Sequence, residues 1–166
     1  MPDALAVITK AISEHHAIRK HVKLAGDTVN DIEAFFALQR TQSGWSQTSI
    51  TALIEKQDQL LQTISFLEQG LKNHFGFEEE ALPPLFGELL MKAILHEHYE
   101  ISRQIESTKT TLTNIELKGP DQRELLSKKS QVQGTINQLC QAVEEHAHHE
   151  EIVLSMIKKV LEENKA

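Results

Sequence analysis

The chain has 166 residues, of which 40% are hydrophobic and 25% charged, so it falls in the range of globular proteins and outside that of disordered chains. Its 24 acidic and 17 basic residues give a formal net charge of −7, the wrong sign for binding the phosphates of nucleic acids. A single cysteine, Cys140, excludes an internal disulfide, and the sequence lacks both a run of about 18 apolar residues and an N-terminal secretion signal. We therefore expect a cytoplasmic protein, folded as one domain over residues 1–166, with neither a nucleic acid nor a membrane as partner.

The first half of the chain predicts two long helices. Each carries one apolar stripe at steps of three and four residues, which is the spacing of a helix face. The polar residues 41–46 separate the two, and Pro83-Pro84 ends the second, because a residue before proline is pushed away from helical backbone angles. The first stripe comprises Ile8, Ala11, His15, Ile18, Val22, Ala25, Val29, Ile32 and Phe36, and the second comprises Leu53, Gln57, Leu60, Ile64, Leu67, Leu71, His74 and Glu78.

The second half repeats this organisation. Gly119-Pro120 ends a third helix, and Asp121 with Glu124 forms a capping box for a fourth. Four helices of roughly 30 to 45 residues with short connections predict an all-α fold, an antiparallel up-down-up-down four-helix bundle. The third stripe comprises Leu90, Ile94, His98, Ile101, Ile105, Thr108, Leu112 and Ile115, and the fourth comprises Leu125, Val132, Ile136, Leu139, Val143, His146, Glu150, Val153, Ile157 and Val160.

Six polar residues lie on these otherwise apolar stripes. A charge in a bundle interior costs several kcal/mol unless it is paired or bound to metal. The spacing repeats: each half of the chain supplies one histidine from its first helix and a His-x-x-x-Glu pair from its second, which lies on one helix face. We predict that all six meet near the Pro83-Pro84 end of the bundle. They are His15, His74, Glu78, His98, His146 and Glu150.

Four imidazoles and two carboxylates suit a transition metal, whereas calcium or magnesium favours oxygen ligands throughout. If each glutamate bridges two ions and each ion takes two histidines, every metal has four protein ligands. Octahedral iron would then keep one position for a bridging oxygen and one for an exogenous ligand such as dioxygen, nitric oxide or peroxide. We therefore predict a metal centre with an open coordination position.

The pattern of His15, His74-x-x-x-Glu78, His98 and His146-x-x-x-Glu150 resembles the hemerythrin-like family of His-His-Glu cation-binding domains over nearly the whole chain. This resemblance implies a hemerythrin-like four-helix bundle with a non-haem centre of two iron ions, bridged by an oxo or hydroxo group, and with these six residues as ligands. Another transition metal remains an alternative. Members of the family bind or sense oxygen, nitric oxide or redox state, which implies a small diatomic ligand or oxidant as partner.

The sequence also departs from the oxygen-carrying hemerythrins. These have a His-x-x-x-His on the third helix, whereas Ile94 and Ser102 lie four residues before and after His98. Their last acidic ligand follows its histidine by five residues, which would select Glu151; we prefer Glu150 because it lies on the stripe and matches Glu78. We therefore do not predict reversible oxygen transport for this chain.

Several other residues lie near the predicted ligands in the sequence. We expect Glu79, Glu80 and Glu151 to support the ligands by hydrogen bonds, and His16, His21 and His148 to be solvated or supporting. Ligation by Glu151, His149 or His96 remains an alternative, and Gly76 is interpreted as permitting close helix approach. For function we favour a sensor or binding module over a dedicated enzyme. The alternatives are a di-iron oxidoreductase that reduces peroxide, oxygen or nitric oxide, and a metal-free helical interaction module.

Overall fold

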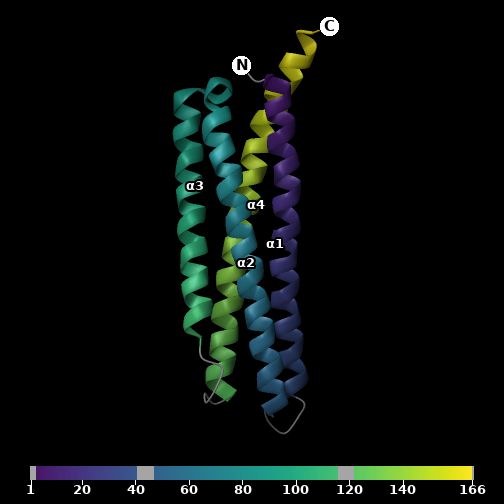
Figure 1. The fold of residues 1–166 in the computed structure, drawn as a ribbon, viewed down its shortest axis with the longest axis vertical. Helices are drawn as coiled ribbons and strands as arrows, with labels where there is room; N and C mark the ends of the chain where they lie inside the picture. Colours follow the sequence, from purple (N-terminus) through teal and green to yellow (C-terminus); the bar gives the residue numbers. More distant parts are fainter. Residues whose placement is uncertain (1–2, 41–46, 116–121, 166) are drawn as a thin grey trace.

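The structure, a computed structural model, describes residues 3–40, 47–115 and 122–165. It contains α1 (Ala4–Arg40), α2 (Gln47–Ala81), α3 (Pro83–Asn114) and α4 (Gln122–Glu163), of 37, 35, 32 and 42 residues. The helices run alternately down and up, and the junction of α2 with α3 lies at the same end as both termini (Figure 1). This confirms the predicted all-α, up-down-up-down four-helix bundle. The polar stretch 41–46, Gly119-Pro120 and the proposed cap Asp121 lie outside the described residues.

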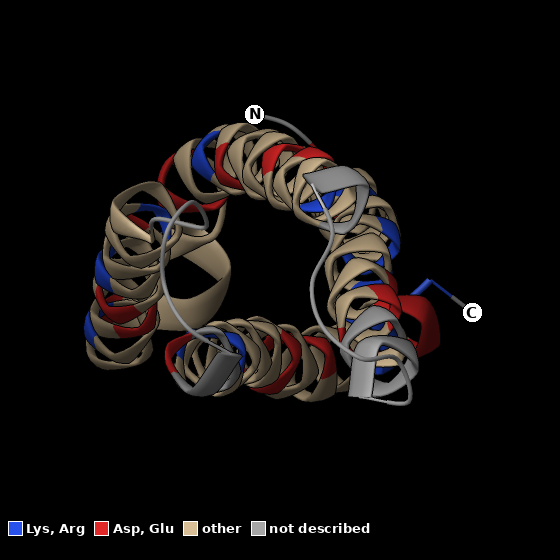
Figure 2. Ribbon diagram, turned by 90° about the horizontal axis from the view of Figure 1, so that it is seen from below, with Lys and Arg blue, Asp and Glu red and all other residues tan. Residues whose placement is uncertain are grey.

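Seen along its axis, the bundle is a ring of four helices (Figure 2). The neighbours are α1 with α2, α2 with α3, α3 with α4, and α4 with α1. An inward side chain at any level therefore meets side chains from the other helices, so a single site can draw on all four. None of the described helices is long and apolar enough to cross a membrane.

The junction between α2 and α3 is short because two prolines follow it. The Leu82 N–H donates to the Glu78 carbonyl at 2.9 Å, and Pro83 and Pro84 then begin α3, where the missing N–H of proline is tolerated. Gly87 interrupts the first part of α3 with φ 77° and ψ 172°. Glycine adopts this positive φ without the strain that a side chain would bring. The proline pair thus ends α2 where the sequence predicts.

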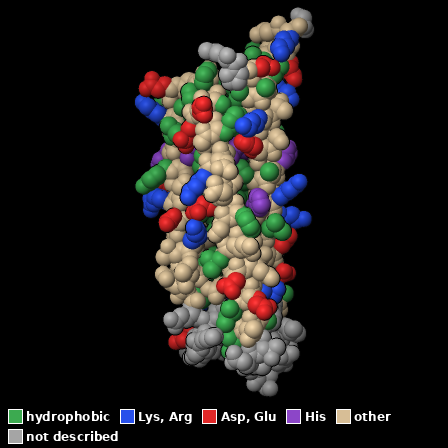
Figure 3. Space-filling model, in the orientation of Figure 1, with side chains coloured by type: hydrophobic (Ala, Val, Ile, Leu, Met, Phe, Trp, Pro, Cys, Tyr) green, Lys and Arg blue, Asp and Glu red, His purple; other side chains and the backbone are tan. Residues whose placement is uncertain are grey.

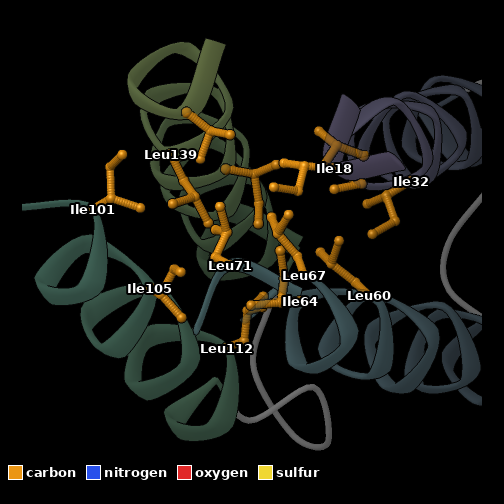
Figure 4. Packing of buried hydrophobic residues seen from close by; sticks show 14 of the residues in the cluster. Ile18, Ile32, Leu60, Ile64, Leu67, Leu71, Ile101, Ile105, Leu112 and Leu139 are labelled. Carbon is orange, nitrogen blue, oxygen red and sulfur yellow. The ribbon is translucent and has the colours of Figure 1, made fainter. Parts of the chain in front are cut away.

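The apolar stripes form two core clusters, as predicted for most of their members. The larger cluster holds 16 buried residues, among them Leu60, Ile64 and Leu67 (Figure 4). The smaller one holds seven, including Ile8, Leu82 and Leu154. Buried polar residues lie between the two clusters. The side chains of Phe36 and Leu125 are outside the described part of the chain.

Two ends of the predicted stripes are wrong. On α3 the buried residue is Met91, whereas Leu90 is only half-buried. On α4 the buried residue is Leu154, whereas Val160 is 56% exposed. An α-helix has 3.6 residues per turn, so steps of three and of four residues rotate in opposite directions from the helix face. At Glu150 the four-residue step to Leu154 stays on the inward face, whereas the predicted three-residue step to Val153 rotates away from it.

Candidate metal centre

The six polar residues predicted as ligands meet in one layer of the bundle, which we call the polar layer. Each is buried, with at most 3% of its surface exposed. The layer lies toward the end of the bundle that holds the α2–α3 junction, as predicted, and histidine side chains gather at this level in the space-filling view (Figure 3). The layer takes His15 from α1, His74 and Glu78 from α2, His98 from α3, and His146 and Glu150 from α4.

The polar layer contains two groups of ligand atoms that share both glutamates. In each group, one potential ligand atom per residue lies within 4.8 Å of all the others. We call the group around His15 and His74 position A, and the group around His98 and His146 position B. Glu78 and Glu150 belong to both. The arrangement has the two-histidine, shared-carboxylate form that the sequence predicts.

Glu78 turns one carboxylate oxygen to each position. Its Oε1 lies 2.5 Å from His74 Nε2 and 3.3 Å from His15 Nε2. Its Oε2 lies 3.1 Å from His98 Nε2 and 3.8 Å from His146 Nε2. A carboxylate in this orientation has the geometry of a bridge between two neighbouring cations.

Glu150, and not its neighbour Glu151, lies among the imidazoles. Its Oε1 is 3.0 Å from the Nε2 atoms of both His15 and His146. Glu151 is only partly buried and contacts the opposite nitrogen of His15, Nδ1, at 3.2 Å. The geometry thus favours Glu150 over Glu151 as the acidic residue of the layer.

The hydrogen bonding of the polar layer is incomplete. His74 Nε2, His146 Nε2 and Glu150 Oε2 are buried without a hydrogen-bond partner, although the two imidazole nitrogens lie close to carboxylate oxygens. Buried polar atoms are almost always paired, so three such atoms in one place call for an explanation. His15 and His98 do hydrogen-bond through Nε2 to Glu78 or Glu150. The three atoms left without a partner are imidazole nitrogens and a carboxylate oxygen, which are ligand atoms that a transition-metal cation accepts.

Charge within the polar layer is strongly coupled. Burial by itself would lower the pKa of His15 and His146, but the carboxylates of Glu150 and Glu78 raise these pKa values to about 9 and about 10. Burial would likewise raise the pKa of Glu78, but its close contacts with the four surrounding imidazoles hold it well below its usual range. Without metal, the layer therefore keeps Glu78 ionised by retaining protons on His15 and His146.

A second set of carboxylates surrounds the layer, one for each histidine. Each carboxylate contacts the imidazole Nδ1 and comes from the preceding helix around the ring, with α4 preceding α1. A carboxylate that accepts the Nδ1–H fixes the imidazole tautomer and leaves the Nε2 lone pair free for a metal. The pairs are His15 with Glu151 at 3.2 Å, His74 with Glu14 at 3.4 Å, His98 with Glu79 at 2.9 Å, and His146 with Glu97 at 2.6 Å.

Only half of this outer ring was predicted from the sequence. Glu79 and Glu151 do hydrogen-bond to imidazoles as predicted, whereas Glu80 is exposed. The roles of Glu14 and Glu97 were missed. The repeated dipeptides Glu14-His15 and Glu97-His98 carried the signal, but each of these glutamates serves the histidine of the next helix, which only the fold reveals.

One member of the outer ring has a basic partner. The Arg19 guanidinium donates to both carboxylate oxygens of Glu151, at 2.6 and 3.0 Å, and to Glu144 at 2.8 Å. Burial would raise the pKa of the Glu151 carboxyl, but Arg19 holds it below its usual value. This contact fixes Glu151 outside the layer and distinguishes His15 from the other three imidazoles.

The remaining candidates lie outside the polar layer. His96, His16 and His148 are exposed, and His149 donates its Nδ1–H to Glu97 at 2.9 Å on the surface. The interpretation of Gly76 as a point of close helix approach is wrong, because a Cβ built there would meet no atom within 4 Å.

Comparison with known proteins agrees with this geometry. The family profile described as the hemerythrin HHE cation binding domain matches residues 33–157, three quarters of the chain. The match begins after His15, so the structure alone places that residue with the other five. Comparisons with curated proteins and with solved structures give no match. The polar layer and the profile together show that the chain belongs to the hemerythrin HHE cation-binding family.

Proposed function

We propose that the polar layer holds two iron ions, one at position A and one at position B, and that this centre binds a small diatomic ligand or oxidant. The observation that carries the proposal is the pair of two-histidine groups sharing Glu78 and Glu150. Family membership supports cation binding in general, and the identity of the metal and its ligand is our proposal.

The charges of the described residues support two divalent ions. Two such ions bring four positive charges, and the shared glutamates bring two negative ones. The four outer glutamates, at positions 14, 79, 97 and 151, supply four more negative charges, and Arg19 one positive charge. The sum is close to neutrality, which a buried site needs because unbalanced charge is costly to bury.

The protein leaves coordination positions open at each metal. Two imidazoles and two carboxylates provide four protein ligands per ion, and a six-coordinate iron would keep two positions for other molecules. When bound, the iron pair supplies the redox chemistry and the affinity for gases or oxidants. The chain holds each imidazole by its Nδ1 and excludes bulk water with the two apolar clusters around the layer.

Metal analysis combined with optical spectroscopy tests this function. Protein reconstituted with iron should contain two ions per chain, and the reduced form should change its absorption when nitric oxide is added. One ion or none per chain would overturn the proposed centre. Turnover of oxygen, peroxide or nitric oxide with an electron donor would instead favour the oxidoreductase alternative.

The reaction with oxygen separates a sensor from a carrier. The described part of α3 places only His98 in the layer, since Ile94 packs in the smaller apolar cluster and Ser102 is exposed. We therefore expect both metals to stay open to small ligands, and the reduced protein to oxidise in oxygen without storing it. A long-lived oxygen adduct, released intact when the oxygen pressure falls, would restore the carrier reading.

A further inference from the structure

A groove on the surface between α2 and α3 leads toward position B. It has a volume of about 380 Å³ and is lined by Phe75, Gly76, Leu95, His98, Tyr99 and Ser102, among others. A smaller hollow of about 60 Å³ shares Phe75 and Ser102 with it and extends toward the core residues Leu71 and Ile105. His98 of the polar layer thus lines a groove that opens to solvent.

Phe75 separates this groove from the metal-binding atoms of position B. Its ring stacks on the His98 imidazole with centroids 3.8 Å apart and an angle of 12° between the planes. It also meets His146 edge-on, with centroids 5.5 Å apart. Phe75 and His98 both line the groove and both are buried, so a molecule there meets their stacked rings before it can reach the interior of the polar layer.

Small residues keep the groove open on both helices. Gly76 from α2 and Ser102 from α3 are both exposed and line the groove. A glycine inside a helix costs about 1 kcal/mol relative to alanine. No packing contact requires Gly76, because an added Cβ would have no neighbour within 4 Å. The space it leaves is therefore part of the groove and not of the helix packing.

The chemistry of this groove favours a neutral ligand. Phe75, Leu95 and Tyr99 line it together with one cation and one carboxylate, Lys72 and Glu79, whose charges balance. A second groove, of about 140 Å³ between α3 and α4, approaches His146 instead and is lined by Glu97, Glu100 and Glu145. Three carboxylates make the α3/α4 groove favour a cation, whereas the α2/α3 groove has no net charge and offers aromatic and aliphatic side chains to an uncharged gas.

We infer that a neutral diatomic gas reaches position B through the α2/α3 groove, between Gly76 and Ser102, with Phe75 as the last barrier before the metal. This inference rests on the proposed function, since it presumes a metal at position B.

The kinetics of nitric oxide binding test this path. In the iron-loaded, reduced protein, Gly76→Leu should slow nitric oxide association by roughly tenfold or more, equivalent to about 1.4 kcal/mol of added barrier. Ser102→Leu should slow it from the opposite wall. Gly70→Leu is the matched control, because Gly70 lies on the same helix, also has open space around it, and does not line the groove.

Two results would overturn the inference. One is an association rate unchanged by both Gly76→Leu and Ser102→Leu. The other is a slower rate only after Ala142→Leu, which narrows the α3/α4 groove. Metal content, measured for each variant, separates the two proposals: a chain without metal overturns the proposed function, and a loaded chain with unchanged rates overturns only the path.

Relaxation of amide protons by dissolved oxygen gives a readout that does not use iron. In zinc-reconstituted protein under oxygen pressure, the amides of Gly76 and Ser102 should relax faster than that of Gly70, because paramagnetic oxygen enters the groove. Gly76→Leu should abolish the enhancement at Ser102. Equal enhancement at Gly70 and Ser102 would contradict the path.

Discussion

The polar layer and the larger apolar cluster occupy the same faces of the same four helices, yet they are held together by different forces. In the apolar cluster any well-packed side chain stabilises the fold, because burial of apolar area is not directional. In the polar layer every atom needs a partner, and three buried atoms have none among the described residues. The comparison shows that the apolar residues of the stripes form the core, and that the six polar residues leave buried atoms within it that a bound ligand would satisfy.

The energetic contrast is equally clear. Complete burial of a side chain such as Leu67 stabilises the fold by about 1.5–3 kcal/mol. A buried ion pair offsets its own desolvation only when its geometry is good. We therefore expect the apolar cluster to carry the stability of the bundle and the polar layer to carry its binding.

The largest expected effect is the loss of metal from both positions when a shared carboxylate is removed. Glu78→Ala or Glu150→Ala should reduce metal content from two ions per chain to well below one, because each carboxylate belongs to both groups. Elemental analysis measures this. His16→Ala and His148→Ala, which change exposed histidines, should keep full content. Loss of iron in His148→Ala but not in His146→Ala would refute the register of α4.

A core substitution should show the opposite behaviour. Leu67→Ala should lower the free energy of unfolding by about 2–5 kcal/mol through lost burial and a residual cavity. The metal content should stay at two ions per chain. Denaturant unfolding and metal analysis of the same sample measure both, with Leu24→Ala as the control at a 54% exposed leucine. If Leu67→Ala lost metal while it was still fully folded, the apolar cluster and the polar layer would not act independently.

Metal removal should destabilise the bundle through the polar layer alone. Binding at a free metal concentration 1,000 times the dissociation constant raises the free energy of unfolding by about 4 kcal/mol. For a chain of this size this raises the Tm by roughly 10 °C. Thermal unfolding with and without a chelator measures it. Leu67→Ala should show the same metal-dependent shift from a lower starting Tm. An unchanged Tm on metal removal would contradict the coupling of binding to folding.

Outer-ring substitutions should have smaller, graded effects. Glu97→Gln should weaken metal binding by about 10- to 100-fold, because Glu97 lies 2.6 Å from the His146 Nδ1 and fixes its orientation. Glu14→Gln should have a weaker effect, since its contact to His74 is 3.4 Å long. Competition with a chromophoric chelator measures the affinities. Equal effects, or none, would count against the outer ring as a positioning element.

The pH dependence of the metal-free protein tests the polar layer without any metal. The pKa values of His15 and His146 are raised from 6.5 to about 9 and about 10, so their stabilisation is complete below pH 6.5 and is lost as pH rises through these values. The lowered pKa of Glu78 stabilises the fold above its ordinary value of 4.5 and loses this effect in acid. Stability should therefore peak between about pH 4.5 and 6.5 in chemical unfolding. Leu67→Ala should lower the whole curve without moving its maximum.

The sequence predicted the fold and the members of the polar layer well, because helical periodicity is a local property. His74 and Glu78 share a face by spacing alone, as do His146 and Glu150. The errors lie at stripe ends, where Leu90 and Val153 were assigned inward positions that Met91 and Leu154 occupy, and where Val160 is exposed. Spacing accumulates a rotational error at such ends, and only packing against neighbouring helices corrects it.

The sequence by itself determined four helices, one inward face on each, and six polar residues that those faces bury. It determined this because each feature depends on residues three or four positions apart on one helix. Tertiary structure alone decided which oxygen of Glu78 turns to which pair of imidazoles, that Glu14 and Glu97 serve histidines on the next helix, and where a groove reaches His98. These features depend on the rotation and relative height of separate helices. Packing across the bundle sets both, and the spacing of residues within one helix does not determine them.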